Sequence, residues 1–231
     1  MPSELERADL LAPAALMLAL TFSMGVIDAV GYLGLDRVFT GNMTGNVVIL
    51  AMAVTGADGL PVVGPLLALL GFAGGAAAAG RVLKSAPSGW TGPTSAIFAA
   101  VGCCLLMLTG VLLLPGLGDP GRLLVTTLLG AAMGAQAAAA RHVAVKDVTT
   151  VVVTSTITAV AADSRLGNAT GSHWRRRGAA VGLIMLGALT GALLLRVHIA
   201  LGLSLAAAVT LLVTWAGHRR HVVAPSRVRA R

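Results

Sequence analysis

Charged residues are scarce in this chain of 231 residues, and their scarcity excludes most soluble folds. Asp, Glu, Lys and Arg make up 11% of the sequence, whereas apolar residues make up 56%. A soluble globular domain carries about 25% charged residues, because its surface must be solvated by water. The mean hydropathy of +0.87 indicates instead that a lipid bilayer surrounds most of this chain.

Aromatic residues and cysteines are also few. The two cysteines, Cys103 and Cys104, are adjacent in an apolar segment, which is typical of small packing residues and not of a disulfide or metal site. The sequence has no Walker lysine motif and no Gly-x-Ser-x-Gly elbow, and its five histidines lie at segment ends or in the tail. We therefore expect no metal, no cofactor and no enzymatic activity.

Long apolar segments recur along the chain, and six of them are long enough to cross a bilayer. A membrane-spanning helix needs about 20 predominantly apolar residues. We therefore predict an all-α, polytopic membrane helical bundle with spans at Ala12–Leu35, Leu60–Val82, Thr94–Leu114, Arg122–Ala140, Gly178–Leu195 and Ile199–Trp215.

Two further apolar pieces, Thr44–Thr55 and Val148–Ala162, are too short to cross unaided. At about 1.5 Å per residue they cover roughly 18–23 Å, which is typical of re-entrant or broken helices. Polar residues begin each piece, and polar groups survive within a bilayer only against protein or a hydrated cavity. Such interruptions often mark the place where a membrane protein binds or moves something.

The formal net charge of +8 is concentrated at the ends of apolar segments and in the tail 217–231. Cations in these positions meet anionic lipid headgroups, so we expect a bilayer and no nucleic acid as partner. If the tail is cytoplasmic and neither short piece crosses, the only basic residues outside are Arg37, Arg122 and Arg196. The positive-inside rule therefore favours six spans in the inner (plasma) membrane, although a topology in which only the first short piece crosses fits it equally well.

A weak internal repeat divides this single transmembrane domain into halves at about 12–115 and 120–216. One constant offset aligns Met24-Gly25 with Met133-Gly134 and Thr40 with Thr149, and a slightly larger one aligns Gly71 and Gly75 with Gly187 and Gly191. Because each half holds an odd number of spans, the second half would be inverted relative to the first. A site near the midplane between the halves is expected of that arrangement.

The residues around the first short piece resemble a known family. The runs Gly25-Val26-Ile27-Asp28-Ala29 and Met43-Thr44-Gly45-Asn46 are similar to the signature of the YoaK family, also described as domain of unknown function 1275. The resemblance covers nearly the whole chain and implies a bacterial six-span membrane protein without a settled activity. The chain departs from the family pattern at Ala137, where Asn is usual.

Asp28 is the sharpest single candidate, because it falls well inside the first span. A carboxylate at the bilayer centre costs at least about 2.5 kcal/mol. One interpretation is a proton or cation site. The other is a packing carboxyl that bonds to Asn42 or Asn46, and the two are compatible.

The polar run beside it offers hydroxyls, amides and backbone N–H groups at the start of a short helix. Such an N-terminus favours an anionic or polar ligand. We predict solute contacts from Thr40, Asn42, Thr44 and Asn46, with Gly41 and Gly45 allowing an unwound backbone. The alternative is that Asn42 and Thr44 only cap the helix.

The second half would supply the opposite wall of the site. We predict that this wall contains Gln136, Thr149, Thr150 and Thr154. The alternative is that the threonines bond to their own helix or join helices. We therefore hypothesise a transporter or channel for a small polar solute or ion, proton-coupled through Asp28. A non-transporting scaffold or sensor is the alternative, followed by a membrane-embedded enzyme. Glycine pairs such as Gly71-x-x-x-Gly75 pack helices within one chain or between copies, so a homo-oligomer stays open.

Overall fold

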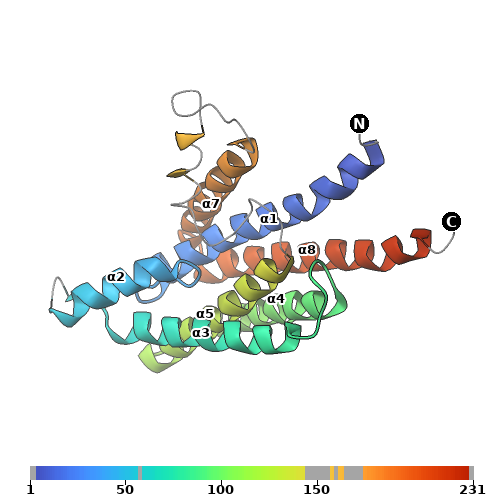
Figure 1. Ribbon diagram of the computed structural model, residues 1–231. Helices are drawn as coiled ribbons and strands as arrows, with labels where there is room; N and C mark the ends of the chain where they lie inside the picture. The colour runs from blue at the N-terminus through green and yellow to red at the C-terminus, as the bar shows by residue number, and fades with distance from the viewer. Residues whose placement is uncertain (1–3, 57–58, 144–156, 159–160, 164–173, 229–231) are drawn as a thin grey trace.

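The computed structural model describes residues 4–56, 59–143, 157–158, 161–163 and 174–228 of the protein. Within these ranges the chain is largely helical and contains no strand (Figure 1). The helices, in chain order, are α1 (Glu4–Gly34), α2 (Met43–Val54), α3 (Val63–Leu83), α4 (Gly92–Leu112), α5 (Asp119–Val143), α7 (Trp174–Leu195) and α8 (Ile199–Val228).

All of these helices except α2 contain an apolar stretch of 19–25 residues, which is long enough to cross a bilayer. The 12 residues of α2 are too few to do so. The prediction of an all-α, six-span membrane bundle with a short helix in its first half is therefore confirmed. The second short piece, 148–162, lies mostly outside the described residues.

Helix ends differ from the predicted ones by a few residues, for local reasons. α4 begins at Gly92 and not at Thr94, because Thr91 and Thr94 form a capping box. The Thr94 Oγ1 accepts a hydrogen bond from the Thr91 amide at 2.6 Å, and the Thr91 Oγ1 accepts one from the Thr94 amide at 3.4 Å. α3 begins at Val63 and not at Leu60, since a residue that precedes a proline, here Pro61, disfavours the helical conformation.

Glycines bring α3 and α5 into backbone contact. A Cβ added at Gly75 would overlap the carbonyl of Ala131, and one added at Gly134 would overlap the carbonyl of Phe72. Gly71 and Gly130 make similar close approaches across the same pair. These glycine motifs therefore pack helices within the chain, which answers a question that the sequence left open.

Glycines also hold a second pair of helices, α1 and α7, in backbone contact. Gly25 of α1 lies against the backbone of Ile184 in α7, and Gly187 of α7 lies against the backbone of Phe22. Gly191 also approaches Val26. α1 and α7 are therefore as closely packed as α3 and α5.

The remaining long helices, α4 and α8, complete the core. They pack against each other, and α4 also contacts α5 while α8 contacts α1. Fully buried side chains from these helices fill the centre, among them Met17, Phe98, Leu105, Leu129 and Leu203.

α2 lies at the margin of this bundle, beside α3 (Figure 1). It buries Asn46, Ile49 and Ala53. Its other large apolar side chains are exposed, namely Val47, Val48, Met52 and Val54. In a bilayer these side chains would face lipid, where apolar exposure carries no penalty.

Candidate functional site

After α1 ends, the chain folds back along the helix that it has just left. The Val38 amide donates to the Gly31 carbonyl at 3.4 Å, and the Phe39 ring stacks on the Tyr32 ring with centroids 4.9 Å apart. Two residues later, Gly41 lies against the Met24 side chain. Because later residues meet earlier turns of α1, the segment 36–42 returns by about 10–15 Å, at 1.5 Å per helical residue.

α2 then carries the chain back to the end of the bundle from which it came. A Cβ added at Gly64, near the start of α3, would lie 2.6 Å from the Asp36 Oδ2 and 2.9 Å from the Val38 Cγ2. The entry to the segment 36–42 and the start of α3 therefore lie together. Residues 36–56, together with the start of α3, have the arrangement of a re-entrant loop, and α2 does not cross the bundle.

Asp28 holds the returning segment in place. Its Oδ1 accepts hydrogen bonds from the Thr40 amide at 3.0 Å and the Gly41 amide at 2.7 Å, and the Asn42 amide adds a weaker interaction. The side chain is only 8% exposed. Bonds from amides to a carboxylate are stronger than neutral ones, so Asp28 is a strong anchor. Its partners are backbone amides, and Asn46, which the sequence suggested as a possible partner, is not among them.

Asn46 forms a second anchor from the other side. Its Oδ1 accepts from the Phe39 amide at 2.9 Å, and its Nδ2 donates to the Phe39 carbonyl. The same Nδ2 also lies 3.6 Å from the Met43 sulfur. This 1% exposed side chain thus satisfies both backbone groups of the half-buried Phe39.

Glycines make room for the segment. A Cβ at Gly31 would overlap the Val38 carbonyl, one at Gly41 would lie 2.8 Å from the Met24 Cγ, and one at Gly45 would lie 2.7 Å from the Phe39 ring. Gly41 and Gly45 do not have positive φ. Close approach, and not conformational freedom, is therefore what requires glycine at both positions.

Asn42 and Thr44 differ from their neighbours because their side chains are exposed. Asn42 occupies the N-cap position of α2, but its side chain makes no capping hydrogen bond. The alternative that Asn42 merely caps the helix is therefore wrong. Its amide group and the Thr44 hydroxyl stand at the tip of α2, where helix N–H groups carry partial positive charge.

The other predicted residues lie apart from this cluster or outside the described ranges. Gln136 is 3% exposed on α5, and no described group bonds to its Oε1. The buried Thr40 Oγ1 also lacks a hydrogen-bond partner among the described residues. Within the described part of the chain, no hydrogen bond joins Gln136 to Asp28. Thr149, Thr150 and Thr154 lie outside the described residues.

Three features of the site were not predicted from the sequence. They are the close contact at Gly31, the pair of hydrogen bonds between Asn46 and the Phe39 backbone (the Phe39 clamp), and Asp36 at the start of the segment 36–42. Burial raises the pKa of the Asp36 carboxyl above its ordinary value of 3.8, Asp119 raises it further, and Arg122 and Arg37 lower it. Arg37 has a positive φ of 49°, an uncommon conformation for a non-glycine residue. A glycine one turn after an intramembrane Asp was the signal for the first of these.

Comparison with known proteins connects this loop to a family. The model of a family described as "Protein of unknown function (DUF1275)" matches residues 16–216, which is most of the chain. The protein belongs to the DUF1275 family. The match includes Asp28, the returning segment and all of α2, and it confirms the resemblance seen in the sequence.

A named relative supports the assignment. The "UPF0700 transmembrane protein YoaK" of Bacillus subtilis (strain 168) is 29% identical over 148 residues, which cover 64% of this chain and 65% of the relative. The aligned part is thus slightly less than two thirds of that relative's length. No solved structure matches the chain. Among the described residues of this DUF1275 protein, no three His, Cys, Asp or Glu side chains group as metal ligands.

Proposed function

We propose that this DUF1275 protein transports or conducts a small polar solute or ion across the inner membrane. The observation that carries the proposal is the returning loop, in which unwound polar backbone lies alongside a span and is anchored by a buried carboxylate. Non-helical backbone at membrane depth is tolerated where it is buried in protein or lines a cavity, and transporters place their sites at such breaks.

The proposal divides the loop residues into two roles. Asn42 and Thr44, whose side chains are exposed at the tip of α2, contact the solute together with the first N–H groups of the helix. Asp28 and Asn46 position that tip through their bonds to residues 39–41. The opposite wall is assigned to the second half, through Gln136, Thr149, Thr150 and Thr154.

The hydrogen bonds of Asp28 support a proposal of proton coupling. An ionised carboxylate accepts the Thr40 and Gly41 amides in charge-assisted bonds, whereas the neutral acid is a weaker acceptor. Protonation would thus loosen the returning segment and shift the tip of α2. In this scheme Asp28 binds the proton and Asn42 binds the solute.

Inverted halves are part of the same proposal, and helix packing supports them. The repeat relates α1 to α5 and α3 to α7, so exchanging the halves converts the α1–α7 pair into the α5–α3 pair. Both pairs are the ones that glycines bring into backbone contact, through Gly25 and Gly187 in one and Gly75 and Gly134 in the other. A related exchange converts the α1–α8 contact into the α5–α4 contact.

Orientation is proposed from charge. Of the described cations, Arg81, Lys84 and Arg141 lie at or beyond the ends of spans at one end of the bundle, followed by the basic continuation of α8. Arg37, Arg122 and Arg196 lie at the other end, where Asp36 and Asp119 offset part of their charge. The positive-inside rule places the first end, and the C-terminal tail, in the cytoplasm.

A flux measurement tests the proposal. Purified protein in liposomes is assayed against panels of anions, amines and sugars, with Asn42→Ala and Asp28→Asn as variants. We expect flux of one solute class, reduced by Asn42→Ala and altered in pH dependence by Asp28→Asn. Thr190→Ala is the matched control, because that exposed hydroxyl bonds only its own helix, at 2.8 Å from the Leu186 carbonyl. Equal flux in all four proteins would remove the proposed site.

One observation favours the second candidate, a non-transporting scaffold or sensor. Asp28 and Asn46 direct their hydrogen bonds to the same short stretch of backbone, so much of the polar run satisfies itself. Absence of flux for every solute in the panel, with a correctly folded protein, would favour this candidate. An enzymatic role has no support in the described geometry.

A further inference from the structure

A groove runs along the surface where α3, α4 and α5 meet, away from the Asp28 loop. It holds a hollow of about 300 Å³. Its walls are apolar throughout, with Ala78 and Val82 from α3, Ala100 and Cys104 from α4, and Ala131 from α5. Ala78, Val82 and Ala100 are exposed, so the groove is open to the surroundings of the helices.

The hollow lies between the packed faces of three helices. Half of its twelve lining residues are alanines, which have no rotamers that could swing in to fill it. α3 and α5 cannot narrow it by approaching each other, because they already touch through Gly75 and the backbone of Ala131. A space of this size equals about ten water-sized groups at roughly 30 Å³ each, and apolar walls do not hold water. Within a bilayer it must be filled by an apolar chain.

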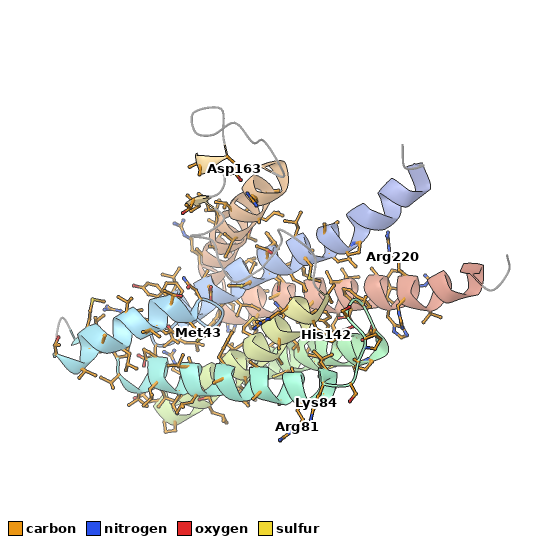
Figure 2. All side chains as sticks on the ribbon, in the orientation of Figure 1. Met43, Arg81, Lys84, His142, Asp163 and Arg220 are labelled. Carbon is orange, nitrogen blue, oxygen red and sulfur yellow. The ribbon has the colours of Figure 1, made fainter. Side chains whose placement is uncertain are left out.

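Cations stand at one end of the groove. Arg81 lies three residues beyond Ala78, and Lys84 lies three beyond Arg81, so the two continue a row along the helix that begins in the groove wall. Both are exposed and project from the end of α3 (Figure 2). Neither forms a salt bridge with an acidic residue in the described part of the chain.

We propose that this groove binds one anionic phospholipid, with an acyl chain along the apolar walls and the headgroup phosphate on Arg81 and Lys84. Apolar walls within the spans match the chain, and unpaired cations at the level where spans end match the phosphate. The site lies on the basic end of the bundle, so the lipid comes from the leaflet on that side. This proposal does not depend on transport.

Charge sets the expected selectivity. A basic side chain near the membrane surface favours an anionic headgroup by about fivefold, which corresponds to about 1 kcal/mol. Two cations should therefore favour phosphatidylglycerol over phosphatidylethanolamine by roughly 25-fold. The acyl chain contributes equally for both lipids, so filling the groove should weaken both.

Native mass spectrometry of the full-length protein, purified with equal amounts of the two lipids, tests this. We expect one phosphatidylglycerol per chain in the wild type. The double variant Arg81→Gln/Lys84→Gln should lose the selectivity, and Ala78→Leu or Ala100→Leu should lose the bound lipid. The two groove variants lie on different helices, so loss of lipid in both is not explained by misfolding of one of them. Gel filtration checks that each variant is monodisperse.

Matched controls decide between this site and general lipid affinity. Ala77→Leu and Ala96→Leu add the same bulk at exposed positions outside the groove wall, and Arg122→Gln removes an exposed cation from the opposite end. All three should retain the lipid. Equal retention of both lipids by the wild type, or equal loss in a control, would overturn the proposal.

The other occupant of such a groove would be a second copy of the chain. Oxidative cross-linking through Cys104, in a Cys103→Ser background, tests that outcome, because Cys104 lines the groove. A Cys104–Cys104 dimer in native membranes would assign the groove to an interface and overturn the lipid site. We expect monomers.

Discussion

Replacement of Asn46 by alanine should release the returning segment without unfolding the bundle. The side chain satisfies both the amide and the carbonyl of Phe39, and it is 1% exposed. Truncation leaves both backbone groups of the half-buried Phe39 without partners, and a buried group left in this way costs about 1–3 kcal/mol. We therefore expect local opening of residues 36–42 to become easier by about 3 kcal/mol, or roughly a hundredfold.

Hydrogen–deuterium exchange with mass spectrometry measures this opening directly. Amides in a locally opening segment exchange at a rate set by the free energy of that opening, whereas the spans report the stability of the bundle. In Asn46→Ala, peptides that cover 36–42 should exchange about 100-fold faster, and peptides from α4 and α5 should be unchanged.

Asn42→Ala is the matched control for this experiment. It removes the same side chain four residues earlier, from an exposed position that makes no capping hydrogen bond. Exchange in 36–42 should stay at the wild-type rate. Equal exchange in Asn46→Ala and the wild type would refute the reasoning, because the clamp on Phe39 would then contribute nothing.

Three further predictions concern packing and charge. Gly31→Ala should displace the segment 36–42, because the new Cβ would overlap the Val38 carbonyl, and the thermal unfolding midpoint in detergent should fall. Gly74→Ala is the control: its Cβ would meet nothing within 4 Å, so the midpoint should not change. Gly75→Ala should destabilise the α3–α5 pair by about 1–3 kcal/mol through overpacking. Gly80→Ala is the control, because its Cβ would meet nothing within 4 Å. Similar thermal midpoints for both variants would contradict the contact between Gly75 and Ala131. The raised pKa of Asp36 means that its stabilising contribution is present below pH 3.8 and is lost as pH rises through the folded-state pKa. Asp36→Asn should flatten this part of the curve of stability against pH. An unchanged curve would show that the pKa of Asp36 is not raised in the folded protein.

Much of the fold could be predicted because spans are a property of composition. A run of about 20 apolar residues can be recognised as a membrane span from its own sequence, without knowledge of the helices that it packs against. Helix ends were less accurate because they depend on single contacts, such as the capping box of Thr91 and Thr94. The choice between the two topologies needed the structure, since counting basic residues left them equal.

The site could be predicted by location but not by role. The polar run and Asp28 were recognisable because such residues are rare within spans. That Asp28 bonds to backbone amides 12 and 13 residues away depends on the return path of the chain, which no local pattern encodes. For Gly41 and Gly45, the sequence suggested flexibility, whereas the neighbours Met24 and Phe39 show that space is the reason.

If the tip of α2 reaches a hydrated path inside the bilayer, a cysteine placed there should react with a water-soluble thiol reagent. In a background with Cys103→Ser and Cys104→Ser, Asn42→Cys is compared with Leu189→Cys, using a membrane-impermeant maleimide on intact vesicles. Leu189 is 57% exposed and lies near the depth of Asp28, because neighbouring Gly191 packs against Val26 and Ala29. We expect labelling at position 42 and none at position 189. Absence of labelling at position 42, or equal labelling at both, would contradict the proposal.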